Sequence, residues 1–154
     1  MESEHSKKAA ELFASGYGCA QAVLAAFSDI TGLDKDTSMR IASSFGGGMG
    51  RMREVCGTCS AMFMVAGLLY GDYDPMDVKA KSAHYALVQE LAVRFKEVHK
   101  TINCRELLGG LADSTPNSTP RTPEFYKVRP CVKFVITAAE ILDKVIADRE
   151  EGKC

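Results

Sequence analysis

Residues 74–102, DPMDVKAKSAHYALVQELAVRFKEVHKTI, decide the fold class of this chain. Their apolar residues recur every three or four positions, which is the spacing that places side chains on one face of an α-helix. Asp74 fits the N-cap of such a helix, Pro75 fits its first position, and Asp77 adds negative charge to its first turn. The stretch therefore predicts a long helix from residues 74–75 to about Lys100. Its inward stripe is Ala80, Ala83, Leu87, Leu91, Phe95, Val98 and Ile102.

Helical spacing recurs on both sides of this stretch, and no segment alternates strongly between apolar and polar residues. We therefore expect an all-α fold, a compact bundle of about five helices with an irregular loop before the last one. The other helices are expected over residues 3–30 with an interruption at 16–18, from Asp34 or Asp36 to Phe45, over 54–70, and over 130–151. The inward residues are expected to be Leu12, Phe13, Val23, Phe27 and Ile30 in the first helix and Cys131, Val135, Ala138, Leu142 and Val145 in the last.

Two glycine-containing segments interrupt the helical pattern. Gly32 is expected to end the first helix. Residues 109–123 are mostly Gly, Ser, Thr, Asn and Pro, and they form a loop of unusual length for a compact domain. This loop is expected to be either a mobile lid or a slack connection.

Composition indicates one domain over residues 1–154, because 46% apolar residues in a chain of 154 can bury a proper core. Nineteen basic and 20 acidic residues leave a net charge of -1, which supplies no general attraction for nucleic acid or anionic membrane. Residues 55–70 carry no charge, but they are shorter than a membrane span and predict a buried bundle helix. The first residues lack a basic start followed by an apolar run, so we expect a cytoplasmic protein.

Four of the six cysteines fall where a helix is expected to begin: Cys19, Cys56, Cys104 and Cys131. The free amides and the dipole at a helix N-terminus favour thiolate over thiol, and thiolate attacks disulfides and binds metals. Cys19 and Cys131 also lie on the inward faces of their helices, so the sulfurs are expected to meet in a shared interior. Cys154, at the C-terminus, is expected to be incidental.

Cys56-Gly57-Thr58-Cys59 places two sulfurs nearly one helical turn apart, close enough to oxidise together. This favours thiol-disulfide redox chemistry, with Cys56 as nucleophile and Cys59 or a distant cysteine as the resolving thiol. Two other interpretations stay open. In the first, Cys19, Cys56, Cys104 and Cys131 are ligands of an iron-sulfur cluster or another thiolate-bound metal. In the second, the chain is a scaffold whose buried thiols are inert.

The run Gly46-Gly47-Gly48-Met49-Gly50 permits either a tight turn between two helices or backbone contact with a ligand, through Gly47 and Gly48. Arg51 and Arg53 precede Cys56, Arg105 follows Cys104, and Arg129 lies two residues before Cys131. Such cations could stabilise thiolates or an anionic ligand, and Arg53 is our candidate for ligand contact. With 19 basic residues in the chain, this proximity is only supporting information.

The sequence around these cysteines, from about Leu12 to Asp148, resembles the redox-active protein family named for its pattern C_GCAxxG_C_C. The matching pieces are GYGCAQAV at 16–23, Cys56-Gly57, CRELLG at 104–109, and Cys131 leading into AAEIL at 138–142. The resemblance implies a helical fold, four family cysteines at Cys19, Cys56, Cys104 and Cys131, and either redox activity or a prosthetic group such as an iron-sulfur cluster. This chain has Thr58-Cys59-Ser60-Ala61 where the family has alanine and a later glycine, so it carries an extra thiol. The redox partner protein is unknown from the sequence, and a homodimer is a further prediction.

Overall fold

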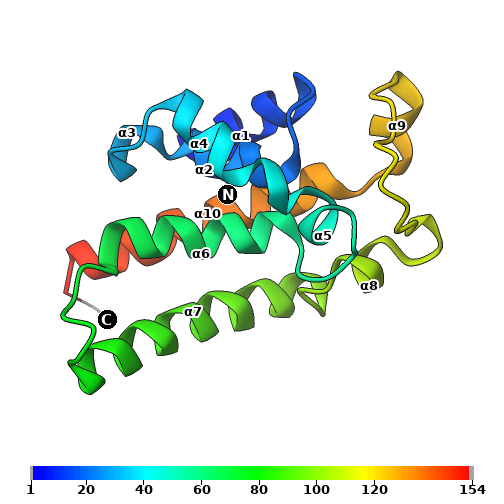
Figure 1. Cartoon of the computed structure of the whole chain (residues 1–154). Helices are drawn as coiled ribbons and strands as arrows, with labels where there is room; N and C mark the ends of the chain where they lie inside the picture. The colour runs from blue at the N-terminus through cyan, green and yellow to red at the C-terminus, as the bar shows by residue number, and fades with distance from the viewer. Residues whose placement is uncertain (1, 153–154) are drawn as a thin grey trace.

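A computed structural model describes residues 2–152, and Cys154 lies outside the described residues. The described chain is all-helical, as expected, and is divided into more and shorter segments than a bundle of about five helices. Figure 1 shows them along the chain. The α-helices are α1 (Glu4–Ala14), α2 (Cys19–Ala26), α3 (Ser28–Thr31), α4 (Lys35–Ala42), α5 (Gly46–Met49), α6 (Gly57–Tyr70), α7 (Val78–His99), α8 (Cys104–Leu108), α9 (Pro123–Val128) and α10 (Cys131–Glu150). Short 3₁₀ turns cover Ser43–Phe45 and Gly109–Leu111.

The apolar helix α6 lies at the centre of the molecule. It packs against α2, α7 and α10, and α1 packs against α2 and α10 (Figure 1). Its side chains from Gly57 to Met62 are all buried, and so are Val65 and Ala66. The largest buried side chains of the shared core are Phe27, Phe95, Leu24, Met62 and Leu91. The prediction of a buried bundle helix is therefore confirmed, and no helix in residues 2–152 combines the length and apolarity that crossing a membrane requires.

Several helix ends form as the sequence predicts. The Asp34 carboxylate accepts a hydrogen bond from the Thr37 amide at 2.6 Å and caps α4. Gly32 ends α3 in a left-handed conformation.

The inward face of the last helix also forms as expected, because Val135, Ala138, Leu142 and Val145 are buried.

Other expectations were wrong in their boundaries. The interruption expected at residues 16–18 does separate α1 from α2, but a second break, at Phe27, was not predicted. Ile30 is 40% exposed because this break rotates α3 out of the earlier helical phase. The helix expected at residue 54 begins at Gly57.

The long helix also begins later than predicted. The Asp77 carboxylate, not that of Asp74, caps α7 by accepting from the Ala80 amide at 3.0 Å, while Asp74 accepts from Met76 in a preceding turn. Leu87, Leu91 and Phe95 are buried, but Ala83 and Val98 of the predicted stripe are exposed. They are exposed because α7 lies at the edge of the bundle and buries only a narrow stripe.

The predicted loop over 109–123 contains structure that its composition did not indicate. A 3₁₀ turn opens it, and Pro123 starts the short helix α9 at its end. The Thr122 hydroxyl caps α9 by accepting from the Phe125 amide at 3.2 Å.

Candidate functional site

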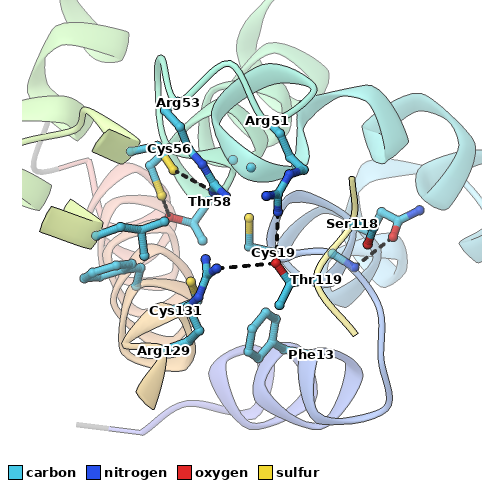
Figure 2. Close-up of a pocket in the computed structure, with 18 of the residues that line it drawn as sticks. Phe13, Cys19, Arg51, Arg53, Cys56, Thr58, Ser118, Thr119, Arg129 and Cys131 are labelled. Atoms are coloured by element: carbon cyan, nitrogen blue, oxygen red, sulfur yellow. Dashed lines mark hydrogen bonds between the residues drawn. The ribbon is translucent and has the colours of Figure 1, made fainter. Parts of the chain in front are cut away.

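Four helix N-termini from distant parts of the chain meet at one pocket. Cys19, Cys104 and Cys131 are the first residues of α2, α8 and α10, and Cys56 is the N-cap of α6. All four cysteines line the same cavity of about 450 Å³. Figure 2 labels three of them, Cys19, Cys56 and Cys131. The four sulfurs therefore lie around one cavity, as we expected from the sequence. Cys56 and Cys104 are buried, whereas Cys19 and Cys131 are partly buried.

A short antiparallel bridge aligns the first residues of α6 and α8. Val55 pairs with Asn103, the Cys56 amide donates to the Ile102 carbonyl at 2.7 Å, and the Cys104 amide donates to the Glu54 carbonyl at 2.6 Å. The Asn103 side chain then caps α8 by accepting from the Glu106 amide at 3.1 Å. These bonds fix Cys56 and Cys104 beside each other, although they are far apart in the sequence.

The glycine-rich run forms a left-handed turn beside the pocket. From Gly47 to Arg51 every φ angle is positive and lies between 58° and 67°. This left-handed conformation costs L-residues energy, whereas glycine adopts it freely. A Cβ atom at Gly48 would lie 2.6 Å from the Cys104 Cβ atom, so only glycine lets the turn approach this close. At the start of α6, a Cβ atom at Gly57 would lie 2.7 Å from the Cys19 sulfur. The amide of Gly47 donates to the Cys19 sulfur.

Cys56 and Cys59 form the only cysteine pair on one helix in the described chain. The Cys59 thiol donates a hydrogen bond to Cys56, and this contact lowers the pKa of Cys56 from 9.0 to about 7, against the opposing effect of burial. The Thr58 hydroxyl, 3.1 Å from the Cys56 sulfur, and the amides of Thr58 and Cys59 favour the thiolate as well. Cys59 itself is fully buried, and its hydrogen bond to Cys56 raises its pKa.

The other pocket thiols are held in the neutral form. Burial is the main cause that raises the pKa values of Cys19 and Cys104, and it raises that of Cys131 to about 11. Negative charge on neighbouring sulfurs adds to the effect, and this coupling joins every pair among Cys19, Cys56, Cys104 and Cys131. At neutral pH, Cys56 is therefore the pocket thiol with a substantial thiolate fraction.

Arginines attach the loop before α9 to the rim of the pocket. Arg51 donates to the Thr115 carbonyl at 2.8 Å and to the Thr119 hydroxyl at 3.0 Å. Arg53 donates to the Asp113 carbonyl at 2.9 Å. Pro116, Ser118 and Thr119 of this loop line the cavity. Hydrogen bonds from Arg51 and Arg53 therefore hold the loop over residues 113–119 across the pocket, and the loop is not a slack connection.

Most of the predicted site residues lie together. Gly47 and Arg53 line the cavity with the four helix-start cysteines, Gly48 lies behind Cys104, and Cys59 lies behind Cys56. Arg105, predicted near Cys104, is exposed and does not line the cavity. Arg121 was not predicted as a site residue, and its guanidinium lies 4.7 Å from the Phe13 ring centre and 4.5 Å from that of Phe125. Arg121 lies in the segment 109–123, whose composition predicts only an irregular loop and does not indicate a contact with the pocket.

In residues 2–152, no three Cys, His, Asp or Glu side chains lie close enough together to hold a single metal ion. The described cysteines are therefore not arranged as the ligands of a mononuclear metal site.

A comparison with protein families gives a match. The model of the family described as "Putative redox-active protein (C_GCAxxG_C_C)" matches residues 17–145. The chain belongs to this family. Comparison with curated proteins and with solved structures gave no match.

Proposed function

We propose that this protein catalyses thiol-disulfide exchange, with Cys56 as the nucleophile and Cys59 as the resolving thiol. The observation that carries the proposal is the Cys56–Cys59 contact at the start of α6, where Cys56 faces the cavity and Cys59 lies behind it. The lowered pKa of Cys56 supports the assignment, since the thiolate is the attacking species.

The reaction proceeds in two balanced steps. The Cys56 thiolate attacks one sulfur of a disulfide RSSR, forms the mixed disulfide Cys56–SR and releases RS⁻, which takes a proton from solvent. Cys59 then loses its proton and attacks the Cys56 sulfur, so that the Cys56–Cys59 disulfide forms and the second RS⁻ leaves. RSSR is reduced to two thiols, and the Cys56–Cys59 pair is oxidised.

Turnover requires a reductant, and we propose a partner protein with a reduced dithiol that returns Cys56 and Cys59 to thiols. Cys19, Cys104 and Cys131 complete the thiol set of the pocket, and their raised pKa values keep them protonated while Cys56 reacts. We propose that the protein acts in a reducing compartment such as the cytoplasm, where widely spaced cysteines stay available as thiols. A homodimer stays a prediction.

The test treats the reduced protein with hydroxyethyl disulfide, a neutral reagent, and follows thiol content and adduct mass. We expect the wild type to lose two thiols and retain no adduct. Cys59→Ser is expected to accumulate a mixed disulfide on Cys56, and Cys56→Ser to form none. Full reaction of Cys56→Ser would refute Cys56 as nucleophile, while an internal disulfide in Cys59→Ser would assign resolution to a distant cysteine.

Anaerobic purification with metal analysis tests the competing interpretation. Stoichiometric iron or zinc that is lost when any one of Cys19, Cys56, Cys104 and Cys131 is changed to serine would replace the exchange proposal with a metal site.

A further inference from the structure

The pocket wall is positively charged. Four arginines, Arg51, Arg53, Arg121 and Arg129, line the cavity, and no carboxylate is among the described residues that line it. A concave surface with charges of one sign concentrates its field inside the cavity and attracts ligands of the opposite sign. These arginines come from the glycine turn, the loop before α9 and the residues before α10, so folding brings them together as it does the cysteines.

Arg53 carries an unused hydrogen-bond donor. Its side chain is buried, with 3% exposed, and Nε donates to the Asp113 carbonyl while Nη1 lies 3.7 Å from the Cys104 sulfur. Its Nη2 is buried and has no hydrogen-bond partner within the described chain. An unsatisfied buried donor on a charged group is costly, so this nitrogen favours an acceptor that the protein itself does not supply.

Arg129 approaches the same cavity from the opposite side. Figure 2 shows Arg51 and Arg129 pointing toward Thr119, whose hydroxyl accepts from Arg51 at 3.0 Å and from Arg129 at 3.4 Å. Arg51 is also paired with the Asp113 carboxylate at 3.5 Å, which offsets its charge. Among residues 2–152, neither Arg53 nor Arg129 forms such an ion pair. The charge of Arg53 still contributes to lowering the pKa of the Asp113 carboxyl group. Arg121 has no ion pair among these residues either, but its guanidinium lies over the Phe13 and Phe125 rings. We therefore take Arg53 and Arg129 as the arginines that face a ligand with their charge.

We propose that the pocket selects small anionic disulfides, with an oxyanion group of the substrate, carboxylate or phosphate, bound by Arg53 and Arg129. This inference rests on the exchange function proposed above and adds the substrate class. A guanidinium group suits these anions because its donors match two oxygens at once. Binding the anionic group there holds the S–S bond inside the cavity that Cys56 faces, and the exchange steps are unchanged.

Three aliphatic disulfides of similar size test this charge selection: dithiodipropionate, which is anionic, hydroxyethyl disulfide, which is neutral, and cystamine, which is cationic. Each rate of mixed-disulfide formation in Cys59→Ser is divided by the rate of the same reagent with free cysteine. We expect the anionic reagent to be favoured over the neutral one by about tenfold, the factor that one charge-assisted hydrogen bond supplies. The cationic reagent should be slowest.

Arg53→Gln and Arg129→Gln, each in the Cys59→Ser background, should each remove most of this preference, measured as the ratio of the anionic to the neutral reagent's normalised rate in the same variant. Arg105→Gln in the same background is the matched control, because Arg105 also adjoins a pocket cysteine in sequence but does not line the cavity. Should Arg53→Gln fail to fold, Arg53→Lys keeps the charge but loses the paired donors, and it should retain only part of the preference.

Competition identifies the anionic group. Slowing of the dithiodipropionate reaction by millimolar phosphate or by acetate supports the site and shows which oxyanion it prefers, whereas slowing by neither overturns it. Equal normalised rates for the three reagents at Cys56 would refute the charge selection while the exchange function stands. Failure of all three to modify Cys56 would instead refute the exchange function.

Discussion

Cys56 differs from the other pocket thiols mainly because of its neighbour Cys59, with smaller contributions from the Thr58 hydroxyl and the amides of Thr58 and Cys59. All of these thiols are removed from water, which by itself raises a thiol's pKa. Only Cys56 receives a hydrogen bond from a second thiol, that of Cys59, and only its pKa falls. The chemical identity of residue 59 therefore decides whether the pocket contains a reactive sulfur at neutral pH.

The pH dependence of Cys56 alkylation should show this effect. The reactive form is the thiolate, so the rate with iodoacetamide should rise with pH and reach half its limit near the pKa of about 7. Cys59→Ala removes the donor and should move the midpoint up toward the ordinary value of 9.0. Cys59→Ser keeps a hydroxyl donor and should stay nearer the wild type. A midpoint that Cys59→Ala leaves in place would show that Cys59 does not stabilise the thiolate.

The glycine turn is the element that packs against Cys104 and leads into Arg51 and Arg53. Its left-handed backbone runs from Gly47 to Arg51, and Arg53 is also left-handed, with φ of 60°. Non-glycine residues in this conformation carry strain of about 1–3 kcal/mol each, which surrounding contacts must offset. Such strain accumulates at sites where the position of a side chain matters more than local stability.

Two glycines of this turn separate the effect of backbone strain from that of close packing. Gly48→Ala adds a methyl group 2.6 Å from the Cys104 Cβ atom and 2.8 Å from the Glu54 amide nitrogen. Gly50→Ala has a similar φ of 58° but its nearest neighbour is 3.9 Å away. We expect Gly50→Ala to lower the free energy of unfolding by about 1 kcal/mol and Gly48→Ala by about 3 kcal/mol. Urea denaturation measures both, and equal losses would argue against the close approach.

The elements also show how far sequence reasoning reaches. Local signals such as a cap at Asp34 or Asp36, the stop at Gly32 and a last helix opening at Pro130 were predicted, and the structure has the cap at Asp34 and the first residue of α10 at Cys131. Asp74 and Asp77, three residues apart, both suit an N-cap, and the one that caps α7 is Asp77. Helix α9 and the role of Arg121 depend on aromatic contacts with α1, and no local pattern encodes those contacts.

At the scale of the whole molecule, α6 joins the reactive end to the core. Met62 lies one turn beyond Cys59 and is fully buried. Met62→Ala should lower the free energy of unfolding by about 3 kcal/mol, because it leaves a cavity in a closely packed interior. Met76→Ala is the control, since Met76 is 83% exposed and its loss should change stability by less than about 0.5 kcal/mol. Denaturation curves for the two variants give the comparison, and similar values would contradict a core built around α6.

The site itself could be anticipated only in part. Four cysteines at helix starts indicated that sulfurs would gather, and the family pattern named the same four. Which charges surround them depends on the paths of the glycine turn and of the loop before α9. Arg105 and Arg129 both adjoin a cysteine in sequence, yet only Arg129 reaches the cavity.

The pocket draws its thiols from α2 near the beginning of the chain and from α10 near its end. During synthesis, Cys19 and the Cys56–Cys59 pair leave the ribosome long before Cys131, so they stay unshielded while the remaining helices are made. The pocket is therefore complete only when α10, which begins at Cys131, packs against the earlier helices. Assembly of the proposed exchange site waits for the last helix of the chain.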